Sequence, residues 1–281
     1  MDESPLLDQC AGLIAQSSGL LIAAGAGMGV DSGLADFRGP EGLWRAYPPL
    51  RQAGLRFEEI ANPQAFLHDP GLAWGFYGHR LQRYREVNPH QGFSILREIA
   101  ARLPDGAFVF TSNVDGHFQK AGFADDAVYE VHGSIHHLQC AAPCSERIWS
   151  AEGFEPVVDA SVCRLVSPQP CCPDCGGLAR PNILMFGDWN WLEWRSGQQE
   201  ARFATWRAAA KNPVVIELGA GKSVATVRMM SERSGFPLIR INLRDPEVSS
   251  SRHIGVAMGA LAALEGIRAA LAKMGFLPAG S

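Results

Sequence analysis

The sequence predicts an α/β protein: a Rossmann-like, doubly wound parallel sheet with a small inserted module of helices and a zinc ribbon. Three observations predict it. Short apolar runs end in glycine or small polar residues, as buried parallel strands do. Helical patterns separate these runs, which is typical of a doubly wound sheet. Six of the seven cysteines lie between Cys140 and Cys175, in a stretch with little periodicity.

The apolar runs and the helical patterns alternate along the chain. The expected strands are 19–24, 107–111, 213–218 and 237–242. The expected helices are 6–17, 91–103, 222–234 and 256–273. In such a sheet, ligand-binding loops follow the carboxyl ends of the strands, so the residues just after each strand are the candidates for function.

Two segments break this alternation. Residues 45–87 are rich in aromatic side chains and arginine, with helical pieces punctuated by proline, and residues 136–180 hold the cysteines. We expect these segments to pack together as the small module. Residues 1–44, 88–135 and 181–281 then form a discontinuous Rossmann-like nucleotide-binding domain.

Composition and charge narrow the class of protein. The 281 residues are 47% hydrophobic and 19% charged, with a formal net charge of -4. Because no Lys/Arg run stands out, nucleic acid is not expected as a direct partner. The start of the chain, MDESPLLDQC, is acidic, and no apolar run reaches membrane-spanning length. We therefore expect a cytoplasmic monomer without membrane contact.

Two cysteine pairs have the spacing of a zinc site with four thiolate ligands. They are Cys140-x3-Cys144 and Cys172-x2-Cys175. Four ligands leave no open coordination position, so the zinc is expected to be structural and to hold the ribbon together. The alternative is four buried free thiols. Cys171 is an ambiguous neighbour of the second pair, and Cys163 is expected to be spare.

A glycine loop follows the first expected strand. It reads Gly25-Ala26-Gly27 and runs on to Asp36-Phe37-Arg38. A Gly-x-Gly turn after a strand can hold a phosphate, although Val30 stands where the dehydrogenase fingerprint has its third glycine. An arginine beyond such a turn can pair with a pyrophosphate, and a phenylalanine can lie over a flat ring.

This stretch resembles the first signature of the sirtuin family, NAD-consuming protein deacylases, which usually reads GAG(I/A)S..SGIPDFR. Further matches follow in the family's order over nearly the whole chain. Residues 111–116 resemble the TQNIDG motif, 131–134 the catalytic His-Gly segment, 180–188 the RP.VV.FGE segment, and 240–242 the asparagine strand.

The resemblance implies an NAD-dependent protein-lysine deacylase that acts on an acylated protein or peptide. Its products would be nicotinamide, free lysine and O-acyl-ADP-ribose. His132 would be the general base for a ribose hydroxyl, Asn113 would hold a ribose hydroxyl or water, and Asp115 the nicotinamide amide. The alternatives are a satisfied core histidine at 132 and turn formers at 113 and 115.

The same resemblance assigns NAD binding to loop residues at several strand ends. They are Gly25, Ala26, Gly27, Asp36, Phe37, Arg38, Ser112, Asn113, Asp115, Gly219, Ala220, Gly221, Lys222 and Asn242. Two places depart from the family. Ser112 replaces a glutamine, and Ala220-Gly221 replace a threonine and a serine. Lys222 either contacts phosphate or is a solvated charge.

Substrate contacts are expected in the segment that includes Phe186, Gly187 and Asp188, which in sirtuins pairs with the backbone of the substrate peptide. Three tryptophans follow within six residues, Trp189, Trp191 and Trp194. They form either a hydrophobic cover on the sheet or a substrate-binding lip.

Tyr77 and Arg80 are three residues apart, so on a helix they share one face. Together, a phenol and a guanidinium can hold a carboxylate. The pattern resembles the Tyr-x-x-Arg pair of class III sirtuins, which remove succinyl and malonyl groups. The alternative is that Tyr77 packs in the module and Arg80 is a solvated helix charge.

Two other functions stay open for this fold and site. One is an NAD-dependent ADP-ribosyltransferase or NAD hydrolase, in which another nucleophile captures the ribose. The other is a non-catalytic NAD-binding sensor.

Overall fold

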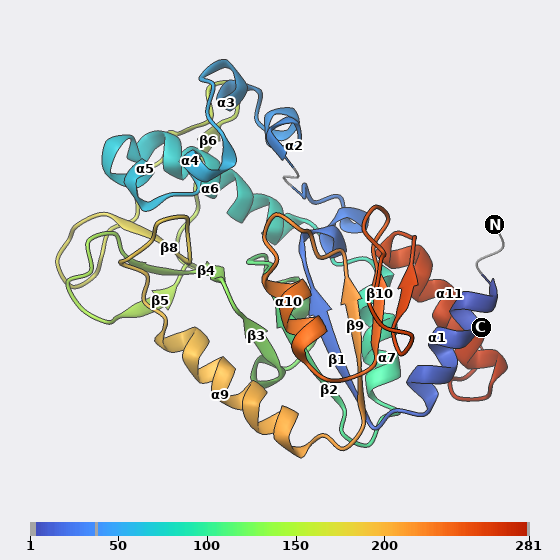
Figure 1. The fold of residues 1–281 in the computed structure, drawn as a ribbon. Coiled ribbons are helices and arrows are strands. Elements are labelled where there is room, and N and C mark those ends of the chain that lie inside the picture. Colours follow the sequence, from blue (N-terminus) through green and yellow to red (C-terminus); the bar gives the residue numbers. More distant parts are fainter. Residues whose placement is uncertain (1–3, 37–38, 280–281) are drawn as a thin grey trace.

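A computed structural model describes residues 4–36 and 39–279, and its centre is a six-stranded parallel sheet in the order β11-β10-β9-β1-β2-β3 (Figure 1). The strands are β1 Gly19–Ala24, β2 Ala107–Thr111, β3 Val128–Glu130, β9 Pro213–Leu218, β10 Leu238–Ile241 and β11 Ile254–Val256. Every residue of β1 and β9 is buried, because helices cover both faces of the sheet.

The helices form two layers, one on each face. Helices α1 Ser4–Ala15, α7 Gln91–Ala100 and α11 Ala260–Lys273 cover one face and share its apolar core. Helices α9 Trp194–Ala209 and α10 Thr226–Arg233 cover the other face. Side chains of β1 alternate between the two cores, with Ile22 in the first and Leu21 in the second.

The order of the strands places a switch point beside β1. The chain passes from β1 to β2 and β3 on one side, then returns to β9, β10 and β11 on the other. Three short elements lie beside these strands: η1 Ala26–Ser32 follows β1, α8 His117–Lys120 follows β2, and η2 Asp125–Ala127 directly precedes β3. Ligands of open parallel sheets bind where the strand order reverses, which here is at the carboxyl ends of β1 and β9.

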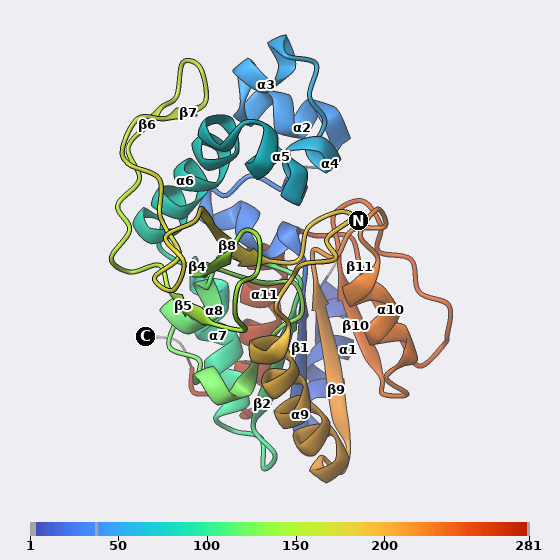
Figure 2. The ribbon, with the colours of Figure 1, turned by 90° about the vertical axis from the view of Figure 1, so that its left-hand side faces the viewer.

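A second unit of helices and short strands lies beside the sheet (Figure 2). Its helices are α2 Gly39–Ala46, α3 Pro48–Gln52, α4 Phe57–Ile60, α5 Pro63–His68 and α6 Pro70–Glu86. Its strands are β4 Gly133–Cys140, β5 Ile148–Ser150 and β8 Ala179–Ile183, which form one sheet, and the pair β6 Val158–Asp159 and β7 Arg164–Leu165. Trp74, Phe76 and Tyr77 of α6 are central to its own apolar core.

The expected strands at 19–24, 107–111 and 213–218 are confirmed, and the fourth spans Leu238–Ile241. The helix expected from 222 begins at Thr226. Val256 belongs to strand β11 and not to the last helix, which begins at Ala260. The expected domain boundaries at 135/136 and 180/181 fall inside β4 and β8, which lead from the large sheet into the module. None of the described helices is long and apolar enough to cross a membrane.

Candidate active site

The glycine loops after β1 and β9 contact each other through their backbones. Gly27 N donates to Gly219 O at 3.0 Å. A Cβ at Gly25 would lie 2.7 Å from Ala220 Cα, and one at Gly219 would overlap the Gly27 backbone. Gly219 also has a φ of 59°, which favours glycine. The glycines are therefore required for the packing of one loop on the other, as well as being suited to a nucleotide.

Two asparagines predicted to bind NAD brace these loops from opposite sides. Asn113 Nδ2 donates to Gly25 O at 3.0 Å, and Asn242 Nδ2 donates to Ala220 O at 2.8 Å. Asn242 is buried, and its Oδ1 accepts from the backbone N–H groups of Arg244 and Asp245. Asn113 follows β2 and Asn242 follows β10, the two strands that flank the β1–β9 pair.

Ser112 and Asp115 follow β2 in the same region. Ser112 N donates to Ala24 O at 3.1 Å, which ties this loop to β1. Asp115 is buried, and its Oδ1 accepts from His117 N at 2.9 Å. Both residues therefore lie in the loop that follows β2.

His132 lies between β3 and β4, beside the first turn of α10. Its Nε2 is 3.4 Å from Thr226 Oγ1, and its carbonyl accepts from Leu184 N at 2.9 Å. Burial lowers the pKa of His132, and a hydrogen bond with the Ser112 backbone opposes this effect only in part. The imidazole is therefore neutral at neutral pH, which is the state that a general base requires.

The other residues predicted to bind the nucleotide differ in their exposure and in their partners. Ala26 is exposed at the start of η1, and Gly221 is half-buried after β9. Lys222 Nζ pairs with Asp245 at 2.6 Å and Glu247 at 3.5 Å, so these carboxylates compete with any phosphate for its charge. Asp36 is the last residue described before a gap. Phe37 and Arg38 lie outside the described residues.

The segment after β8 carries the predicted substrate contacts. Phe186 N donates to Ala61 O at 2.9 Å, while its ring packs edge-on against Phe57. Gly187 has a φ of 64°. The Asp188 carboxylate is fully buried and pairs with Arg180 at 2.8 Å. Asp188 therefore holds the segment from its buried side.

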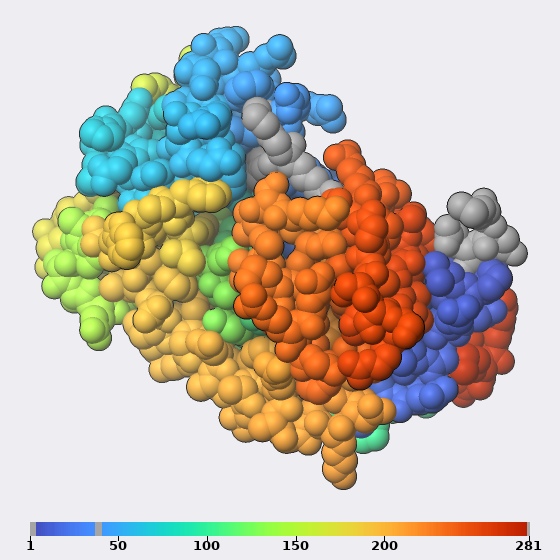
Figure 3. All heavy atoms as spheres, viewed as in Figure 1, coloured from blue at the N-terminus to red at the C-terminus, as the bar shows by residue number. Residues whose placement is uncertain are grey.

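The tryptophan segment borders a cavity instead of covering the sheet. Trp189 is 96% exposed, and Trp194 is 47% exposed with its Nε1 donating to Glu146 O. Trp191 and Trp194 line a cavity of about 520 Å³ that reaches Val131, next to His132. Figure 3 shows this gold segment and the orange residues around α10 on either side of a depression. The arrangement favours a lip over a cover.

Tyr77 and Arg80 share one face of α6, as their spacing predicts. Both residues are buried, and the Arg80 guanidinium lies 5.6 Å from the Tyr77 ring centre and 5.4 Å from that of Tyr84. Arg80 Nη2 also donates to Tyr84 Oη at 2.8 Å. Burial raises the pKa of Tyr77 to about 12, so its phenol stays protonated. Arg80 is not a solvated charge.

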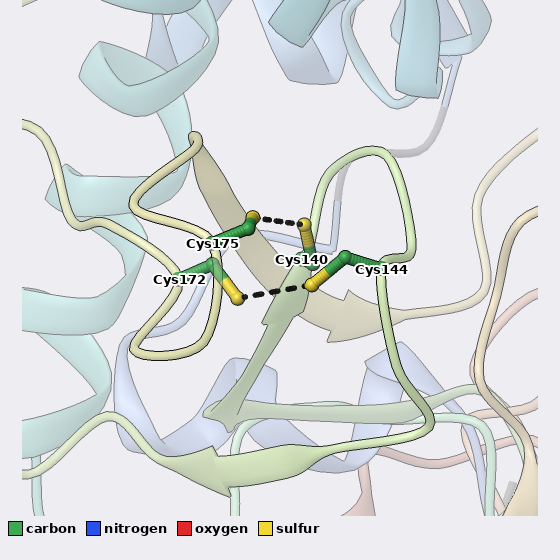
Figure 4. A group of neighbouring side chains, drawn as sticks. All are labelled: Cys140, Cys144, Cys172 and Cys175. Carbon is green, nitrogen blue, oxygen red and sulfur yellow. Dashed lines mark hydrogen bonds between the residues drawn. The ribbon is translucent and has the colours of Figure 1, made fainter.

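Four cysteines form the expected metal cluster (Figure 4). Their Sγ atoms all lie within 4.8 Å of one another, with 3.7 Å between Cys140 and Cys175 and 3.6 Å between Cys144 and Cys172. Four thiolates at the usual Zn–S distance of about 2.3 Å stand about 3.8 Å apart in a tetrahedron. The residues therefore fit a zinc ion. Cys163 and Cys171 lie outside the cluster.

Sequence reasoning missed two residues near His132. Thr226 is the first residue of α10, but the sequence predicts that this helix begins at 222, so Thr226 is not singled out as a residue at the helix end. Glu130 is buried and accepts from Arg195 Nη2 at 2.5 Å and from Gln199 Nε2 at 3.3 Å. Its partners lie on α9, a helix that was not predicted. A lone glutamate in a three-residue strand carries no sequence signal of its own.

Comparison with known proteins agrees with this geometry. Residues 25–224 match the profile of the Sir2 family. An NAD-dependent protein deacylase of Pyrococcus furiosus is 30% identical over 247 residues, covering 87% of this chain and 89% of the relative. NAD-dependent protein deacylase 2 of Pyrobaculum aerophilum is 31% identical over 242 residues, covering 85% of each.

A solved structure extends the agreement to the fold. The crystal structure of a Sir2 homologue–NAD complex superimposes with a TM-score of 0.69 at 25% sequence identity, covering 95% of this chain and 94% of the other. The family match covers most of the chain and includes both glycine loops, His132 and all four clustered cysteines. The chain belongs to the Sir2 family.

Proposed function

We propose that this chain removes acyl groups from protein lysine side chains and consumes NAD as a co-substrate, releasing nicotinamide, free lysine and O-acyl-ADP-ribose. The observation that carries the proposal is His132. Its imidazole is half-buried and neutral near pH 7, it hydrogen-bonds to the Ser112 backbone after β2, and it directly follows Val131, which lines the cavity at the tryptophan segment. The relatives named as NAD-dependent protein deacylases support the same activity.

The strand-end loops have the chemistry that NAD binding needs. Glycine loops follow β1 and β9, and polar side chains follow β2 and β10. We assign the pyrophosphate side to Gly25, Ala26 and Gly27 and the glycine loop at 219–221. Asn113 and Asp115 would meet the ribose and the nicotinamide amide. The described position of Lys222, paired with Asp245, makes it a weaker phosphate ligand than its sequence position indicates.

The proposed reaction divides into two transfers. The acyl oxygen of the substrate bonds to the ribose carbon as the bond to nicotinamide breaks. His132 Nε2 then accepts a proton from a ribose hydroxyl, whose oxygen attacks the acyl carbon, and water completes the release of lysine. Because His132 is neutral, it can accept this proton without first losing one.

We further propose that the acyl group includes acidic chains such as succinyl and malonyl. Arg80 supports this, since it is a buried cation set among three aromatic rings with Tyr77 on the same face. A buried guanidinium pairs strongly with a carboxylate. The zinc would have a structural role, because its four cysteines leave no coordination position for a substrate.

Product analysis tests the proposed function. The purified chain is incubated with NAD alone and with NAD plus acetyl-, malonyl- or succinyl-lysine peptides, and all products are identified by mass spectrometry. Nicotinamide release that depends on peptide, with O-acyl-ADP-ribose formed in equal amount, is the expected result. Nicotinamide release without peptide would support an NAD hydrolase or ADP-ribosyltransferase, and tight NAD binding without turnover would support a sensor.

A further inference from the structure

Strand β3, which leads to His132, is short and lies at one end of the strand order. In the described part of the chain its partner strand is β2, to which Val131 N donates at Thr111 O over 2.9 Å. Successive residues of a strand turn their backbone groups to opposite sides, so the N–H and C=O of Glu130 face away from β2. A short strand at a sheet edge needs other partners for these groups.

Helix α9 runs beside β3 and supplies these partners (Figure 1). Gln199 Oε1 accepts from Glu130 N at 3.1 Å, and Ser196 Oγ donates to Glu130 O at 3.1 Å. The same helix holds the Glu130 side chain, whose Oε2 accepts from Gln199 Nε2 at 3.3 Å and from Arg195 Nη2 at 2.5 Å. Three side chains of one helix thus bind the N–H, the carbonyl and the carboxylate of a single strand residue.

These contacts are shielded from water. Glu130 is 1% exposed, Ser196 2% and Gln199 3%. A buried polar group that loses its partner is not solvated in exchange, so the strand is held where all the contacts are made. Gln199 uses both ends of its amide on Glu130, and therefore joins the backbone and the side chain of that residue to α9.

The position of the His132 imidazole depends on this strand. The ring hydrogen-bonds to the Ser112 backbone, and its Nε2 is 3.4 Å from Thr226 Oγ1. A shift of β3 along β2, where Glu130 pairs with Thr111, would move the imidazole relative to both partners. A general base must lie within hydrogen-bond reach of the proton it accepts, and a misplacement of about 1 Å can lower a rate about a hundredfold.

We propose that Gln199 is a positioning residue for the general base: through Glu130 and β3 it holds His132 in place for the second transfer. This role rests on the proposed function, in which His132 acts after nicotinamide has left. Loss of the Gln199 contacts therefore slows the second transfer and leaves the first intact. A residue that only stabilises the fold would affect both transfers alike.

Gln199→Met tests the proposal, because methionine fills a similar volume and makes neither hydrogen bond. Gln198→Met, at an exposed neighbour on α9, is the control. The first transfer is measured as peptide-dependent exchange of labelled nicotinamide into NAD, since its reversal re-forms the bond to the ribose. The second is measured as O-acyl-ADP-ribose formation. We expect Gln199→Met to lower kcat for O-acyl-ADP-ribose roughly tenfold to hundredfold, with exchange and the KM for NAD retained, and the control to match wild type.

Equal product formation by Gln199→Met and wild type, or parallel losses of exchange and product formation, would overturn this role. A wild type that forms no O-acyl-ADP-ribose would instead refute the proposed function, and the role of Gln199 with it. If Gln199→Met unfolds, Ser196→Ala replaces it, because it removes the hydrogen bond to Glu130 O and only one heavy atom. The same separation of exchange from product formation is then expected, and its absence would contradict the proposal.

Discussion

Gly133 packs directly against the carbonyl of Asn182. A Cβ at Gly133 would overlap that oxygen, and the φ of Gly133 is 78°, a conformation that favours glycine. Gly133 pairs with Ile183 where β4 meets β8, and it directly follows His132. The close approach of the two strands therefore fixes the position of the imidazole.

Gly133→Ala is expected to lower both the thermal midpoint and the deacylation rate. Gly235→Ala is the matched control, because Gly235 has a φ of 83° and open space where its Cβ would be. Backbone strain alone costs about 1–3 kcal/mol, so the control should lose that much and Gly133→Ala distinctly more. Thermal unfolding followed by circular dichroism gives the comparison. Equal losses in the two variants would show that the contact with Asn182 does not matter.

The cysteine cluster is expected to hold one zinc ion per chain. Cys175→Ser should lose the metal and unfold the small module, because such a loop-rich segment depends on its metal. Cys171→Ser is the control, since Cys171 is an exposed neighbour outside the cluster. Elemental analysis and thermal unfolding of both variants provide the check. A folded, metal-free wild type, or a Cys175→Ser variant of unchanged stability, would refute the assignment.

Arg80→Met is expected to lower activity on succinyl-lysine far more than on acetyl-lysine. Losing a charge-assisted hydrogen bond costs about 1.5–3 kcal/mol, roughly a tenfold to hundredfold change in selectivity. Arg83→Met is the control on the same helix, because the Arg83 side chain is 46% exposed. The ratio of kcat/KM for the two peptides is measured for each variant. The same loss on both peptides would show that Arg80 supports the module without contacting the acyl group.

Much of this architecture could be predicted because buried parallel strands and glycine loops leave continuous signals in the sequence. The elements that were missed leave weak ones. Strand β3 has three residues, too few for a periodicity. Helix α9 begins at Trp194, in a tryptophan-rich segment that predicts either a cover on the sheet or a substrate-binding lip. Val256 is apolar, and only its pairing with Ile241 shows that it belongs to the sheet.

In the candidate site, too, the sequence predicts local motifs but not the partners that come from distant elements. Motif positions such as His132, Asn113 and the cysteine pairs are local in sequence, so the sequence alone predicts them, and the clustering of the four cysteines is confirmed. The partners of Lys222, Asp188 and Arg195 come from other elements, so only the fold shows which charges are already engaged.

The pH dependence of deacylation should report the His132 imidazole. Burial lowers its pKa below the ordinary value of about 6.5. The neutral form is the base, so activity is present above this lowered pKa and is lost as the pH falls through it. We expect the acidic limb of the kcat/KM profile to lie below about pH 6.5. An acidic limb at higher pH would contradict a desolvated His132 as the base.

The central claim is that His132 is the general base of an NAD-dependent deacylase. Its most direct test is the rate of O-acyl-ADP-ribose formation by wild type and His132→Ala, with NAD affinity measured on the same samples. We predict a rate lower by about 10² to 10⁴ in His132→Ala, with NAD affinity nearly unchanged. Formation of O-acyl-ADP-ribose by His132→Ala at the wild-type rate would contradict the claim.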